Sequence, residues 1–280
     1  FIATWLAVSN TGAKPVPVEP DELTYNIDPT LVEAAITPST KAIIPVHLYG
    51  LPADMDAINA IAQKYQLRVI EDAAQGMGGE IRGKKAGAFG DIAATSFFPA
   101  KPLGCYGDGG AVFTNDDKLA EIINSIRLHG KGTEKYDNVR IGLNSRLDTI
   151  QAAILIEKLK IFPDELLARD RLATAYTDTL IDNVTKPTVV KGMTSTWAQY
   201  TLRVNDRPSL QAGLTAAGIP SVVYYPKSLT QQAGYCNFPV VSSGVHVSND
   251  LPSQVISLPM HPYLNNVDEI CDAVNGSFAD

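Results

Sequence analysis

Residues 42–72 read AIIPVHLYGLPADMDAINAIAQKYQLRVIED, and this stretch holds two short apolar runs, 42–46 and 67–70, that are rich in β-branched residues. Between the runs, apolar residues recur at helical spacing as far as Gln66, with Asp54 as the expected N-cap. A strand, a helix and a second strand in this order indicate a parallel βαβ unit. The sequence therefore predicts an α/β fold with a mainly parallel sheet.

The pattern changes near the dipeptide Phe162-Pro163. Before it, we expect strands at 92–98 and 111–114 and helices at 116–128 and 148–160. After it, we expect helices at 164–180, 208–217 and from 267 onward, and a strand at 201–204, without βαβ repetition. The chain is therefore predicted to form a large domain, residues 1–163, and a smaller α+β domain, residues 164–280.

Composition excludes several classes of function. The 280 residues are 45% hydrophobic and 19% charged, and the formal charge is 23 − 30 = −7 without a basic cluster. These values predict a soluble globular protein that binds neither nucleic acid nor an anionic membrane. Neither a metal-ligand spacing nor a basic leader is present, and the three cysteines are widely separated, so we expect no metal and a cytoplasmic location.

A second informative stretch is 96–110, SFFPAKPLGCYGDGG. Lys101 follows an apolar strand and lies between two prolines, whereas Asp72 and Gln75 follow another strand. Ligands of open α/β sheets bind beyond the carboxyl ends of the strands, so Asp72, Gln75, Ser96 and Lys101 could converge. A lysine and an aspartate there could serve as the Schiff-base residue and the pyridinium partner of pyridoxal phosphate. The alternative is a salt bridge at the sheet edge.

With these motifs the sequence resembles the DegT/DnrJ/EryC1/StrS family of sugar aminotransferases, which are pyridoxal-phosphate enzymes of fold type I. The resemblance implies fold type I here, with a large cofactor-binding domain and a smaller C-terminal domain. It extends over nearly the whole chain in the family's order, on residues 1–4, 12–16, 45–50, 71–75, 96–110, 127–130, 144–147 and 258–264.

The resemblance assigns a role to each matching residue around the cofactor. Lys101 matches the lysine that binds the cofactor covalently and moves protons, and Asp72 matches the partner of the pyridine nitrogen. Gln75 matches the residue beside the phenolic oxygen, and Ser96 matches a phosphate-binding hydroxyl. Phe1 falls where the family stacks an aromatic ring on the cofactor.

Other matches imply a homodimer with active sites at the subunit interface. Asn144 matches an asparagine that reaches the phosphate of the neighbouring subunit, and Arg146 would face the substrate there. Tyr224 replaces a histidine expected near the nucleotide sugar, and Tyr225 follows it in the same motif. His129 is a weaker candidate for substrate contact. We expect the motif residues His47 and His261 to be structural.

The residues after Lys101 resemble family members that aminate C-3 of the sugar. This implies transfer of an amino group from glutamate to a nucleotide-linked 3-keto sugar, UDP-2-acetamido-2-deoxy-3-oxo-glucuronate, for lipopolysaccharide or O-antigen. The alternatives are a dTDP-3-keto-6-deoxyhexose substrate, or a regulatory homologue that binds the cofactor without catalysis. A dehydratase of the same fold would carry histidine in place of Lys101.

The start of the chain carries one further expectation. The sequence begins at Phe1, inside an apolar segment and without an initiator methionine. Members of the family carry an earlier segment with a phosphate-binding glycine-threonine loop. We therefore expect the sequence to be part of a longer protein.

Overall fold

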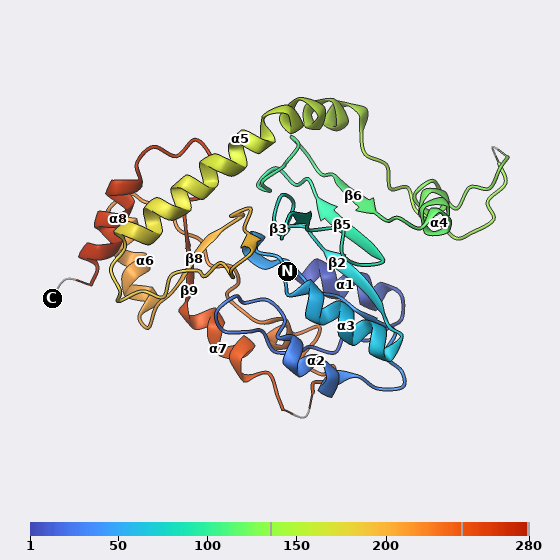
Figure 1. Cartoon of the computed structure of the whole chain (residues 1–280), viewed down its shortest axis with the longest axis horizontal. Helices are drawn as coiled ribbons and strands as arrows, with labels where there is room; N and C mark the ends of the chain where they lie inside the picture. The colour runs from blue at the N-terminus through green and yellow to red at the C-terminus, as the bar shows by residue number, and fades with distance from the viewer. Residues whose placement is uncertain (135, 242, 279–280) are drawn as a thin grey trace.

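The predicted βαβ unit forms the centre of the structure, a computed structural model that describes residues 1–134, 136–241 and 243–278 (Figure 1). The main sheet has the strand order β1-β2-β5-β6. β1, β2 and β5 are parallel and β6 is antiparallel to β5. The predicted α/β fold with a mainly parallel sheet is therefore confirmed. The strands are β1 (Ala42–Ile43), β2 (Arg68–Asp72), β5 (Ile92–Ser96) and β6 (Gly110–Phe113).

Helix α3 (Met55–Tyr65) connects β1 to β2, as expected from its apolar periodicity. The Asp54 carboxylate accepts a hydrogen bond from the Ala57 N–H at 3.1 Å and so caps the first turn. Ile58 and Ala62, on the apolar face of the helix, are buried in one cluster with Ile43 and Val69 of the sheet. Full burial of a side chain such as Ile58 stabilises the fold by about 1.5–3 kcal/mol.

A second core lies in the C-terminal part of the chain. The strands β8 (Tyr200–Arg203) and β9 (Val255–Leu258) pair antiparallel. Helices α6 (Arg207–Ala216) and α8 (Val267–Gly276) lie beside them, on the left of Figure 1. The buried members of this cluster fall between residues 172 and 274, whereas those of the α3 cluster fall between 32 and 81. The two halves of the chain thus have separate cores.

Helix α5 (Thr149–Thr179) joins the two halves of the chain, and its length differs from the prediction. Two helices with a break at Pro163 were expected, but a single helix contains this proline and crosses the top of Figure 1. A proline inside a helix costs about 3 kcal/mol. Packing offsets this cost, because Phe162 is buried against Phe97 and Leu155, and Tyr176 is buried in the C-terminal core.

The other predicted elements form within a few residues of their expected bounds, namely α4 (Asp117–Arg127), β6, β8, α6 and α8. Several further elements were not expected from the sequence. They are α1 (Ile2–Asn10), α2 (Pro29–Ala35), β3 (Glu80–Ile81), β4 (Lys84–Lys85), β7 (Met193–Thr194), α7 (His246–Gln254), the 3-10 turns η1 (Leu48–Gly50) and η2 (Leu229–Gln231), and β9. Within the described residues, no helix combines the length and apolarity needed to cross a membrane.

Candidate active site

Two strand ends meet at one edge of the sheet. β2 ends at Asp72 and the adjacent parallel strand β5 ends at Ser96. The Ala73 N–H donates to the Ala94 carbonyl at 2.8 Å, which extends the pairing just past Asp72. The chain then turns after β5, where the Lys101 N–H donates to the Phe98 carbonyl at 2.8 Å. The structure therefore brings Asp72, Ser96 and Lys101 to the same edge.

The Lys101 amine is partly buried and electrostatically coupled to Asp72. Burial lowers the pKa of this amine below its ordinary value, and the negative charge of Asp72 opposes that shift. In the part of the chain that the structure describes, the Lys101 side chain has neither a hydrogen bond nor an ion pair. A lowered pKa increases the fraction of unprotonated, nucleophilic amine at neutral pH. Lys101 is thus suited to covalent bonding with a carbonyl group.

The Asp72 carboxylate is held by two donors from different segments. One oxygen, Oδ1, accepts the Ala74 N–H at 3.1 Å, and the other, Oδ2, accepts the hydroxyl of Thr4 at 2.6 Å. Because hydrogen bonds are directional, two donors fix the plane of the carboxylate. The sequence analysis did not identify Thr4. Thr4 lies three residues after Phe1. This spacing indicates that the two residues act at the same site only if residues 2–10 are predicted to form a helix.

Gln75 connects Asp72's loop to aromatic residues from elsewhere in the chain. Its side chain is only 5% exposed, and its Oε1 accepts the Tyr49 N–H at 2.7 Å. Its Nε2 donates to the Tyr225 hydroxyl at 3.3 Å. Burial raises the pKa of Tyr225 to about 12, although the hydrogen bond from Gln75 opposes the shift. The Tyr225 phenol is therefore neutral at physiological pH.

Aromatic rings form one wall beside Gln75. The Phe1 ring lies 5.9 Å from the Tyr225 ring, measured between centroids, with an interplanar angle of 37°. Tyr224 packs edge-on against Tyr225 at 5.5 Å, and its carbonyl accepts a hydrogen bond from the Tyr49 hydroxyl. The structure thus brings Phe1, Tyr224 and Tyr225 together.

Beneath the strand end, Glu71 and His47 form a fully buried pair. The His47 Nδ1 accepts the Ala53 N–H, so its Nε2 carries the proton that it donates to Glu71 at 2.9 Å. Burial alone would raise the pKa of Glu71, but His47 and the N–H groups of Gly87 and Gly90 hold it below its ordinary value. The structural role expected for His47 is confirmed.

Ser96 completes the group at the strand ends. Its hydroxyl oxygen accepts the Phe98 N–H at 3.2 Å. Within residues 1–134, 136–241 and 243–278, no acceptor is found for the Ser96 hydroxyl proton, which can therefore be donated to an anion such as a phosphate.

The remaining candidates lie elsewhere. Arg146 donates from Nε to the Asn144 oxygen at 3.1 Å, and both residues line an open groove between β6, α4 and α5. The residues that line this groove do not include Asp72 or Lys101. The backbone N–H of His129 donates to the Leu143 carbonyl in the segment that follows α4. In a single chain, Asn144, Arg146 and His129 are therefore not part of the group at the strand ends.

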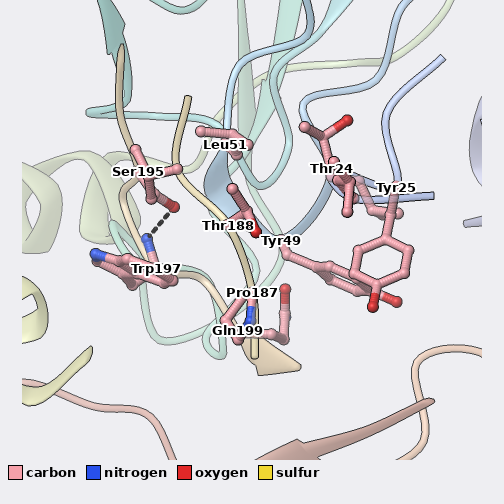
Figure 2. Close-up of a pocket in the computed structure, with 12 residues that line it drawn as sticks. Thr24, Tyr25, Tyr49, Leu51, Pro187, Thr188, Ser195, Trp197 and Gln199 are labelled. Carbon is pink, nitrogen blue, oxygen red and sulfur yellow. Dashed lines mark hydrogen bonds between the residues drawn. The ribbon is translucent and has the colours of Figure 1, made fainter. Parts of the chain in front are cut away.

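A small cavity between η1 and the segment before β8 is not a candidate site (Figure 2). Tyr25, Tyr49, Trp197 and Gln199 are among the residues that line it, and its volume is about 20 Å³. Pockets for small molecules have volumes of about 300–1,000 Å³. The cavity is therefore too small for a cofactor.

The residues at the strand ends fit pyridoxal phosphate chemically. The cofactor needs a carboxylate for its ring nitrogen, an amine for its aldehyde and a donor for its phosphate. Asp72, the amine of Lys101 and the hydroxyl of Ser96 provide these groups. A mainly parallel sheet with such residues at its strand ends is the architecture of the fold type I pyridoxal-phosphate enzymes.

Comparison with known proteins agrees with this class. The chain belongs to the DegT/DnrJ/EryC1/StrS aminotransferase family, whose model matches residues 1–275. It is 50% identical over 277 residues to the UDP-2-acetamido-2-deoxy-3-oxo-D-glucuronate aminotransferase of Pseudomonas aeruginosa, covering 98% of this chain and 76% of that protein. Pyridoxal phosphate is the cofactor of this family.

Solved structures agree as well. A DegT DnrJ EryC1 StrS aminotransferase from Brucella abortus superimposes with a TM-score of 0.98 at 50% identity, covering 100% of this chain and 78% of that one. A Bacillus subtilis protein with bound cofactor PMP superimposes with a TM-score of 0.86 at 32% identity, covering 99% of this chain and 65% of that one. The predicted family and fold are therefore confirmed.

Proposed function

We propose that this protein transfers the amino group of glutamate to C-3 of UDP-2-acetamido-2-deoxy-3-oxo-glucuronate. The observation that carries the proposal is the amine of Lys101, which is partly buried, feels the charge of Asp72 and has no hydrogen-bond partner among the described residues, at the strand ends of an aminotransferase fold. The 50% identity to the Pseudomonas aeruginosa enzyme supports the choice of sugar.

The proposed chemistry divides the work among the residues at the strand ends. When bound, the cofactor supplies a carbonyl group that takes up the amino group and a ring that withdraws electrons. Lys101 holds the cofactor and then moves a proton to or from the reacting carbon of each substrate. Asp72 pairs with the ring nitrogen, and Gln75 lies beside the phenolic oxygen. Phe1 covers one face of the ring.

The choice of sugar rests on the charge of the sugar as well as on the sequence identity to the Pseudomonas aeruginosa enzyme. Glutamate and a uronic acid both carry a carboxylate, which an arginine can bind with two parallel hydrogen bonds. A dTDP-3-keto-6-deoxyhexose carries no sugar carboxylate, so Arg146 would have no partner on it. We propose that Arg146 favours the uronate. The residues that we propose to contact substrate are Arg146, Tyr224, Tyr225 and His129.

We propose a cytoplasmic homodimer in which Asn144 and Arg146 complete the neighbouring subunit's site. Two observations support the dimer. Asn144 and Arg146 line a groove apart from Asp72 within one chain. The adjoining surface of α5 exposes large apolar side chains, with Ile150 73% and Ile156 59% exposed. A second copy of this chain would cover these side chains and bring the two sets of residues together.

The division into a cofactor-binding domain, residues 1–163, and a small domain, residues 164–280, also remains a proposal. The separate cores support it, with the continuous helix α5 as the connection. We further propose that the aminated sugar enters lipopolysaccharide or O-antigen synthesis.

Absorbance spectroscopy tests the function directly. Purified protein with added pyridoxal phosphate should develop a visible band that borohydride reduces irreversibly, and Lys101→Ala should lose it. Lys64→Ala, which changes an exposed lysine on α3, is the matched control and should retain the band. Absence of a reducible band in the unmodified protein would overturn the proposal.

The two substrates are then tested separately. Glutamate alone should convert the bound cofactor and release one equivalent of 2-oxoglutarate. Cofactor binding without this half-reaction would instead favour a regulatory protein. Faster turnover with the dTDP-3-keto-6-deoxyhexose than with the UDP-linked uronate would overturn the assignment of the sugar.

A further inference from the structure

The hydroxyl of Thr4 makes the shortest hydrogen bond to Asp72. Its Oγ1 lies 2.6 Å from Asp72 Oδ2, compared with 3.1 Å between the Ala74 nitrogen and Oδ1. Distances of 2.5–2.7 Å are typical of hydroxyl groups that donate to a charged carboxylate, and such bonds are about twice as strong as neutral ones. The contact joins residues 68 positions apart, so it depends on how α1 is placed over the sheet.

Helix α1 has few other attachments. None of its residues is buried. At its far end, the Ser9 hydroxyl lies 3.0 Å from the Tyr235 hydroxyl, and the Trp5 ring packs edge-on against Tyr235 at 5.2 Å. At its near end, Phe1 precedes the first turn and faces Tyr225. Thr4 therefore links the helix that carries Phe1 to the carboxylate at the end of β2.

We propose that Thr4 is a positioning residue that acts through Asp72. Its hydroxyl holds the carboxylate in one orientation toward the nitrogen of a pyridine ring and fixes Phe1 relative to the same ring. The inference rests on the proposed function, because it needs a cofactor whose ring nitrogen pairs with Asp72. It assigns to α1 a role in setting the cofactor's ring environment.

Three variants separate this role from simple anchoring of the helix. Thr4→Val removes the hydroxyl and keeps the shape, and Thr4→Ser keeps the hydroxyl. Ser9→Ala removes the hydrogen bond between α1 and Tyr235 without touching Asp72. Thr4→Ala serves as a second hydroxyl-deleting variant if valine prevents folding. Circular dichroism of each protein checks the fold.

The measurements are the dissociation constant for pyridoxal phosphate and the position of its visible absorption band in the bound state. Thr4→Val should weaken cofactor binding about tenfold, equivalent to about 1.4 kcal/mol, and shift the band. Thr4→Ser should keep the dissociation constant within about twofold of the unmodified protein and should not shift the band. Ser9→Ala should also leave the band unchanged.

The outcomes distinguish this inference from the proposed function. If the unmodified protein shows no cofactor band, the proposed function itself fails. If the unmodified protein binds the cofactor but Thr4→Val matches it in affinity and spectrum, the positioning role of Thr4 is wrong. The role is equally wrong if Ser9→Ala causes the same shift as Thr4→Val, because helix anchoring would then explain both.

Discussion

Glu71→Gln should destabilise the protein strongly, although it hardly changes the shape of the side chain, because it removes the charge and replaces one acceptor oxygen with an NH₂ group. The Glu71 side chain is 0% exposed. Its Oε2 accepts from His47 Nε2 and the Gly87 N–H, at 2.9 and 2.7 Å. Its Oε1 accepts from the N–H groups of Phe89 and Gly90, both at 2.6 Å. Each oxygen of Glu71 thus accepts from two donors. Glutamine replaces one of these oxygens with an NH₂ group, which faces two donors in either orientation of the amide.

The magnitude follows from these four bonds. Hydrogen bonds to a charged group contribute about 1.5–3 kcal/mol each. Two of the four donors to Glu71 lose their acceptor in the variant. We therefore expect Glu71→Gln to lower the free energy of unfolding by about 3–6 kcal/mol at neutral pH.

The effect should also depend on pH. The folded-state pKa of Glu71 lies below its ordinary value of 4.5. A carboxyl with a lowered pKa stabilises the fold above the unfolded-state value, and this contribution is lost as the pH falls through the folded-state value. The difference between the unmodified protein and Glu71→Gln should therefore shrink as the pH falls below about 4.5.

Guanidinium unfolding followed by circular dichroism measures both effects. Glu33→Gln is the control, because Glu33 pairs with Lys64 on the exposed surface and should contribute nothing measurable. A loss below about 1 kcal/mol for Glu71→Gln at pH 7 would refute the reasoning about the buried acceptor. A difference that stays constant as the pH falls from 7 to well below 4.5 would refute the assigned protonation state.

Two further predictions concern single contacts. Tyr225→Phe should remove a phenol that ionises near pH 12, which ultraviolet difference titration detects. Because the folded-state pKa is raised, the stabilisation by the Tyr225 phenol is present below pH 10 and is lost as the pH rises toward about 12, so the variant should lack that decline. Asp54→Ala should lower the free energy of unfolding by about 1 kcal/mol through loss of the α3 cap, whereas Asp54→Asn should retain it.

Local signals were enough to predict the framework of the site. The apolar periodicity of α3 and its Asp54 cap lie within a dozen residues, so the βαβ unit could be predicted without knowledge of distant contacts. The parallel pairing then follows from the connection, and it brings the ends of β2 and β5 together. Asp72 and Ser96 could be identified for this reason.

Distant contacts explain what the sequence analysis missed. The pairing of Thr4 with Asp72 spans 68 positions, and that of Gln75 with Tyr225 spans 150. Neither has a local signal. The break expected at Pro163 is wrong for a related reason, since the cores that hold α5 on both sides of the proline are formed by residues far along the chain.

Glu71 and Asp72 are adjacent carboxylates at the end of β2 that lie in different environments. Successive side chains of a strand point to opposite faces, so adjacent carboxylates enter different environments. Glu71 faces the interior, where His47 and three backbone N–H groups hold it as a structural anchor. Asp72 lies at the edge where the strands end, and among the described residues its donors are Thr4 and Ala74. The negative charge of Asp72 acts there on the partly buried amine of Lys101. Glu71 therefore fixes the backbone beside Asp72, and the Asp72 carboxylate keeps part of its hydrogen-bonding capacity for the ring nitrogen that we propose it binds.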